Sequence, residues 1–83
     1  MTEPTANARA LIEHIAKSLV EAKDAVFIEE YEDGNETVIE LEVAEEDLGR
    51  VIGRSGRIAR ALRTVLSAAG AKNEKRYALE ILE

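Results

Sequence analysis

The chain has 83 residues, 46% of them apolar, no cysteine and a formal net charge of −6. These values predict one folded domain, residues 1–83, whose core is too small to line a deep catalytic pocket, and they exclude disulfides and thiolate chemistry. A negative charge spread evenly over the surface would also argue against a nucleic-acid partner, so the distribution of charge along the chain is important.

The N-terminal segment predicts an amphipathic helix from about residue 6 to residue 22. Its apolar residues recur at helical spacing and form one stripe: Leu11, Ile12, Ile15, Ala16, Leu19 and Val20. Thr5 or Asn7 is expected to cap this helix. The segment carries glutamates and has no continuous apolar run, so we expect a cytoplasmic protein without a signal peptide or membrane span.

Two β-strands joined by a turn are expected next. Residues 25–32 are rich in β-branched and aromatic side chains. Residues 37–43 alternate, with Ile39, Leu41 and Val43 on one face and glutamates on the other. The intervening sequence DGNE, residues 33–36, supplies turn residues, so the two runs predict an antiparallel hairpin.

Two helices and a third strand complete the predicted order. The carboxylates at 45–47 suit the first turn of a short helix, with Leu48, Val51 and Ile52 as its buried residues. A longer helix is predicted from about residue 57 to residue 69, ended by Gly70. Its expected apolar stripe is Leu62, Val65, Leu66 and Ala69. Alternation resumes at residues 77–82, as expected for a strand.

The predicted order is therefore helix, strand, strand, helix, helix, strand, which indicates an α+β fold. Alternation in the second and third strands predicts a three-stranded sheet with one face in solvent. The helices are expected to pack together on the other face of that sheet.

The two central helices are separated by the sequence GRSG, residues 53–56, where positive charge is concentrated. Residues 1–48 hold fourteen carboxylates and three basic residues, whereas residues 49–83 hold eight basic residues and three carboxylates. Five arginines and no acid lie between residues 49 and 66: Arg50, Arg54, Arg57, Arg60 and Arg63. This asymmetry predicts a local binding surface for a polyanion.

The two glycines of this break favour contact with a phosphate. Gly53 can end one helix in a left-handed conformation, and Gly56 can cap the next. A helix N-terminus attracts anions, and residues without a Cβ let a sugar-phosphate backbone approach closely. Arg54 and Arg57 add bidentate phosphate donors, and the other three arginines extend the positive surface. The alternative is an ordinary helix–helix turn without a ligand.

The stretch LGRVIGRSGRIARALRTVLSAAG, residues 48–70, resembles the Val-Ile-Gly-x-x-Gly signature of KH domains, and the element order is similar to their type II arrangement. Residues 8–83 as a whole resemble the KhpA (YlqC) family, small single-KH RNA-binding proteins of bacteria. The resemblance is densest over residues 46–69. It implies that the loop at residues 53–56 clamps the backbone of about four nucleotides of single-stranded RNA.

The resemblance also implies an apolar groove for the bases between the two central helices and the sheet edge. The candidate RNA-binding residues, with the expected groove lining included, are Arg50, Val51, Ile52, Gly53, Arg54, Ser55, Gly56, Arg57, Ala59, Arg60, Leu62 and Arg63. Three interpretations of Ile58 stay open: a residue that lines the groove, a dimer contact, or a residue that is merely half-exposed. Residues 70–76 correspond to the variable loop, whose three basic residues are further candidates for phosphate contact.

Nothing in the sequence predicts an enzyme. His14 is the only histidine, and no Ser/His/Asp arrangement, metal-ligand spacing or P-loop pattern occurs. We therefore expect no catalytic residue, metal, cofactor or small-molecule substrate. Aromatic residues are scarce and distant in sequence from residues 53–56, which argues against a base-stacking platform. The carboxylates at residues 29–33 are interpreted as a solvated hairpin tip or as a contact for a basic protein.

The resemblance implies single-stranded RNA as the ligand and a role as an RNA chaperone or post-transcriptional regulator, with links to cell shape. It also implies a homodimer, or a heterodimer with a Jag-like (KhpB) KH protein, and no membrane partner. Two other classes stay open. One is a degenerate KH module that acts mainly as a protein dimerisation surface. The other is a helix-turn-helix DNA binder, against which the flanking strands and the glycine-rich break argue.

Overall fold

The computed structural model describes residues 8–72 and 74–83. The elements in chain order are α1 (Ala8–Leu19), β1 (Phe27–Asp33), β2 (Glu36–Glu42), α2 (Leu48–Ile52), α3 (Arg57–Lys72) and β3 (Arg76–Ile81). Single 3-10 turns occupy Lys23–Ala25, Glu45–Asp47 and Arg54–Gly56. The predicted order and the α+β class are confirmed. The expected caps, Thr5 and Asn7, lie outside the described residues.

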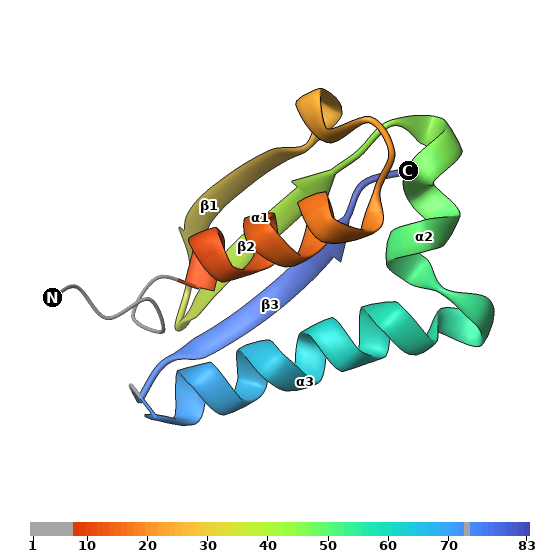
Figure 1. The fold of residues 1–83 in the computed structure, drawn as a ribbon. Helices are drawn as coiled ribbons and strands as arrows, with labels where there is room; N and C mark the ends of the chain where they lie inside the picture. Colours follow the sequence, from red (N-terminus) through yellow and green to blue (C-terminus); the bar gives the residue numbers. More distant parts are fainter. Residues whose placement is uncertain (1–7, 73) are drawn as a thin grey trace, which may run out of the picture.

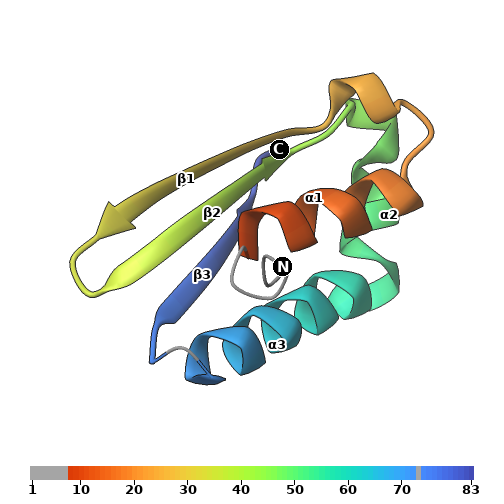
Figure 2. The ribbon, with the colours of Figure 1, turned by 60° about the vertical axis from the view of Figure 1, so that its left-hand side comes forward.

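The sheet has the strand order β1-β2-β3 and is mixed. β1 and β2 form the expected antiparallel hairpin, in which Phe27 lies opposite Glu42. Gly34 has a φ of 65° in the connecting turn, a conformation that glycine adopts readily. β3 returns parallel to β2 after the chain has passed through α2 and α3, so that Arg76 lies opposite Glu36. Both long helices cover the same face of the sheet (Figures 1 and 2).

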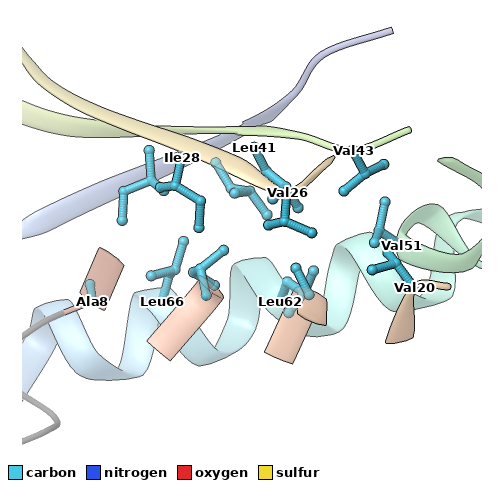
Figure 3. Packing of buried hydrophobic residues seen from close by; sticks show 13 residues of the cluster. Ala8, Val20, Val26, Ile28, Leu41, Val43, Val51, Leu62 and Leu66 are labelled. Atoms are coloured by element: carbon cyan, nitrogen blue, oxygen red, sulfur yellow. The ribbon is translucent and has the colours of Figure 1, made fainter. Parts of the chain in front are cut away.

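The core lies between this helical layer and the sheet. Ile39 and Leu41 of β2 are fully buried and Glu42 is exposed, which confirms the predicted alternation. Figure 3 shows side chains of the sheet, among them Leu41, pointing toward the helices, from which Leu62 and Leu66 point back. These contacts hold α3, and with it the loop that precedes α3, against the sheet.

The structure corrects two expectations for α3. Val65 is 39% exposed, so the side of the helix that faces the core is formed by Leu62, Leu66 and Ala59 instead. Gly70 does not end the helix, which continues to Lys72. A Cβ at Gly70 would overlap the backbone carbonyl of Lys75, so glycine is needed here for the close return of the chain toward β3.

Asp47, expected only to complement a helix dipole, has a larger structural role. It is fully buried and accepts hydrogen bonds from the backbone N–H groups of Glu21 (3.1 Å) and Ala22 (3.0 Å). Arg50 donates to the same carboxylate at 2.8 Å. The N–H donors of Ala22 and Glu21, followed by Arg50, lower the pKa of Asp47, because all of them stabilise the ionised form. Asp47 therefore joins the segment after α1 to the beginning of α2.

We predict that Asp47→Asn lowers the Tm by about 5 °C or more, because an amide NH₂ would face backbone N–H donors. A lowered folded-state pKa means that ionised Asp47 stabilises the fold at neutral pH. This contribution is lost as the pH falls below about 4 toward the lowered pKa. Thermal melts from pH 7 to pH 2 would show a smaller acid dependence in the variant. Glu46→Gln, at an exposed neighbour, is the control, and an equal loss in both variants would contradict the role of Asp47.

Candidate nucleic-acid interface

The loop at residues 53–56 is a tight turn between α2 and α3. Gly53 ends α2 with a φ of 79° and a ψ of 168°, and its N–H donates to the carbonyl of Gly49 at 2.8 Å. Gly56 has a φ of 75° and donates its N–H to the carbonyl of Gly53 at 3.1 Å. Arg57 then has helical dihedral angles and begins α3. Gly53 therefore ends α2 with a positive φ as predicted, but its ψ of 168° lies outside the left-handed helical region that was expected. The positive φ of Gly56 was not predicted.

Ser55 also has a positive φ, 58°, which the sequence did not reveal. A non-glycine residue pays a conformational penalty in this region, so the surrounding turn must enforce it. The carbonyl of Ser55 accepts a hydrogen bond from the Arg60 guanidinium at 3.1 Å. Arg60, one turn into α3, therefore helps to fix the loop in its conformation.

The two glycines are needed for different reasons. A Cβ on Gly53 would overlap the side chain of Ile58 and lie 2.8 Å from its backbone nitrogen. A Cβ on Gly56 would have no neighbour within 4 Å, so only its φ disfavours another residue there. Ile58 is half-buried and packs against the core, which makes it the support of Gly53.

Three of the five arginines expected to bind phosphate have structural partners. Arg50 forms ion pairs with Asp47 at 2.8 Å and Glu21 at 3.9 Å. Arg60 binds the loop carbonyl described above. Arg63 donates to the carbonyl of Leu79 at 3.2 Å and so connects α3 with β3. These side chains contribute positive charge to the surface, but their guanidinium groups already serve the fold.

Arg54 and Arg57 differ from the other three. Both are exposed, and the side chain of neither forms a hydrogen bond or an ion pair within residues 8–72 and 74–83, although the backbone N–H of Arg57 donates to the carbonyl of Arg54. They flank the turn at the beginning of a 16-residue helix, where backbone N–H groups lack partners inside the helix. An anion placed at this turn would therefore meet two available guanidinium groups and the positive end of α3.

The residues expected to line a groove are less accessible than the sequence suggested. Val51, Ala59 and Leu62 are at most 5% exposed and face the interior. Ile52 is half-buried, as is Ile58. The apolar surface beside the loop is thus formed by these two isoleucines, which pack against the core cluster that contains Val51 and Leu62.

The described part of the chain offers neither a metal site nor a membrane-spanning helix. Within residues 8–72 and 74–83, no group of three or more His, Asp or Glu side chains is arranged to hold a metal ion. No helix in the same part of the chain has the length and hydropathy needed to span a membrane.

A Gly-x-x-Gly turn between the second and third helices, on a mixed three-stranded sheet of this order, defines a KH domain of type II. The class agrees with the match of residues 9–81 to the family described as "KhpA/KhpB, KH domain". The chain belongs to this family of non-enzymatic KH proteins. No solved structure matches the chain.

Similar proteins include several called "RNA-binding protein KhpA". The one from Aquifex aeolicus is 55% identical over 73 residues, which cover 88% of this chain and 92% of the relative. The one from Borreliella burgdorferi is 51% identical over 73 residues, covering 88% and 89% of the two chains. The one from Clostridium acetobutylicum is 49% identical over 74 residues, covering 89% and 99%.

We predict that Gly53→Ala destabilises the fold more than Gly56→Ala. The φ of Gly56 makes alanine unfavourable by about 1–2 kcal/mol. Alanine at position 53 combines a backbone region that is nearly restricted to glycine with overlap on Ile58, so about 3 kcal/mol or more is expected. Urea unfolding of the two variants tests this order, and equal losses would contradict the assigned role of Ile58.

Proposed function

We propose that the chain binds single-stranded RNA and holds about four nucleotides by their backbone at residues 53–56. The observation that carries this proposal is the pair of exposed arginines, Arg54 and Arg57, beside the glycine turn that begins α3. Their side chains have no partner in the described chain. Membership of a KH family whose similar members are called RNA-binding proteins supports the choice of RNA as the polyanion.

In this proposal the candidate residues divide into two groups. Arg54 and Arg57 contact phosphates, Gly53 and Gly56 permit close approach of the strand, and Ile52 and Ile58 contact bases weakly. Arg50, Arg60 and Arg63 hold the loop and helices in place and strengthen the positive potential from a distance. The basic residues at the far end of α3 are separated from the loop by the whole helix, so they are secondary phosphate contacts at most.

The cellular role is proposed from the family. We infer an RNA chaperone or post-transcriptional regulator that acts in the cytoplasm and contributes to control of cell shape. Its protein partner would be a second copy or a Jag-like (KhpB) KH protein. If the chain serves mainly as such a protein-pairing module, RNA affinity will be low while the protein complex is tight. Helix-turn-helix recognition of DNA is disfavoured because α2 has only five residues and is tied down through Asp47.

We predict that Arg54→Asp combined with Ser55→Asp abolishes binding of a single-stranded RNA oligonucleotide while the fold persists. Both side chains are exposed, and aspartate tolerates the positive φ of position 55 better than most residues. Two carboxylates would stand where phosphate must approach. RNA affinity by fluorescence anisotropy and the Tm would be measured on the same samples.

The control for this double variant is Lys17→Asp with Ser18→Asp on α1. It makes the same change in charge at two adjacent, partly or fully exposed positions outside the loop. RNA affinity should stay close to that of the wild type. If both double variants bind RNA equally well, RNA is held elsewhere. Tighter binding of duplex DNA than of single-stranded RNA by the wild type would contradict the KH-type mode.

The division of the arginines predicts distinct salt dependences. Log K for a single-stranded RNA should change with log salt with a slope of about −1.4 for the two phosphate contacts of Arg54 and Arg57, and not the slope of about −3 expected if four arginines bound phosphate. Arg54→Ala or Arg57→Ala should each reduce the magnitude of this slope by about 0.7. Arg63→Ala should leave the slope nearly unchanged and lower the Tm, because it removes the bond to Leu79. A slope change in Arg63→Ala as large as in Arg54→Ala would show that the division is wrong.

A further inference from the structure

The sheet face that the helices leave uncovered is strongly acidic. Successive strand residues point to opposite faces, so the face opposite the core residues Ile39 and Leu41 is defined by the strand register. Of the strand residues on that face, only Arg76 is basic. Six are carboxylates: Glu29, Asp33, Glu36, Glu40, Glu42 and Glu80.

Three of these carboxylates form a row across all three strands. Glu29 lies directly opposite Glu40, and Glu40 lies directly opposite Glu80. None of the three forms an ion pair within the described residues. Like charges in direct cross-strand positions destabilise a sheet. The arrangement therefore opposes folding in the free protein, and a cation bound from outside would relieve it.

Tyr31 reports the same negative potential. Its hydroxyl donates to a carboxylate oxygen of Glu40 at 3.3 Å. Partial burial, and then the charges of Glu40, Glu80 and Asp33, raise the pKa of Tyr31, because they disfavour the phenolate. Three carboxylates of the face therefore act on the phenol of Tyr31.

The acidic face also exposes apolar side chains. Phe27 is 59% exposed, Tyr31 43% and Leu82 41%, and the described residues leave only one other large apolar side chain as exposed. Phe27 and Leu82 line a hollow of about 350 Å³, with Glu29, Glu40 and Glu42 around it. An apolar hollow with a rim of carboxylates fits a ligand that has an apolar side chain between positive charges.

We propose that this sheet face binds a lysine- or arginine-rich segment of a protein partner, with an apolar side chain of that segment in the hollow between Phe27 and Leu82. Charge complementarity selects this ligand: nucleic acid is repelled, and two copies meeting through the same face would oppose their carboxylates. The loop at residues 53–56 and the adjoining Arg57, together called the arginine loop, belong to the helical layer on the other side of the sheet (Figure 2). A basic partner and a polyanion can therefore be bound together, and this inference does not depend on which polyanion the loop holds.

The test uses a fluorescently labelled peptide of lysines flanking one leucine, at about 0.15 M ionic strength, where distant charges are screened. The whole chain should bind it saturably, and the triple variant Glu29→Gln, Glu40→Gln, Glu80→Gln should bind it about tenfold more weakly. The same variant should have a higher Tm, because the row of like charges is removed. The matched control, Asp24→Asn with Glu46→Gln and Glu74→Gln, removes three exposed charges elsewhere and should change affinity by less than about twofold.

A second peptide, with serine in place of leucine, tests the hollow. The serine peptide should bind the wild type more weakly than the leucine peptide does. The Phe27→Ser variant should bind the two peptides with equal affinity. The proposal is overturned if the wild type shows no saturable binding below about 1 mM. Equal weakening by the two triple variants also overturns it. A third result would also overturn it: sedimentation shows that the wild type self-associates and that the Phe27→Ser variant does not. The face would then bind a second copy of the chain.

Discussion

The buried carboxylate of Asp47 fixes the position of α2, on which the geometry of the arginine loop depends. It accepts two backbone N–H groups from the segment after α1 and one guanidinium bond from Arg50. A five-residue helix such as α2 has almost no stability of its own. Anchoring its first turn to a different part of the chain, with Val51 buried below, makes it a rigid base for Gly53 and the turn that follows.

From that base the loop is held at both ends. Gly53 packs on Ile58 without room for a Cβ, and Arg60 reaches back from α3 to the carbonyl of Ser55. The unusual φ of Ser55 persists because these contacts determine its position. A loop that is already ordered loses little conformational entropy when a ligand binds, so even two phosphate contacts from Arg54 and Arg57 can be effective.

The sequence predicted the fold well because its evidence is periodic. Alternation around Leu41 and the helical stripe around Ile12 each require a particular secondary structure, and two layers are the simplest way to bury both faces. Contacts between distant residues carry no such signal. Nothing local distinguishes Arg63, whose side chain is bound to Leu79, from Arg57, whose side chain has no partner in the described chain. The site prediction therefore grouped all five arginines together. The role of Asp47 was underestimated for the same reason, since the two backbone N–H groups that donate to it lie 25 and 26 residues away along the chain.

The charge asymmetry of the sequence becomes a separation in space. The folded sheet keeps most of the acidic residues of β1 and β2 on its uncovered face and edge, whereas the arginine loop lies at the end of the helical layer. Carboxylates near the loop would weaken its attraction for phosphate, but Asp47 is neutralised by Arg50 and by backbone donors, and Glu21 lies within 4 Å of the same arginine. The net charge of −6 therefore describes neither surface. One small domain can present a cationic turn and an anionic sheet face because the sheet and the core between sheet and helices keep the two apart (Figure 2).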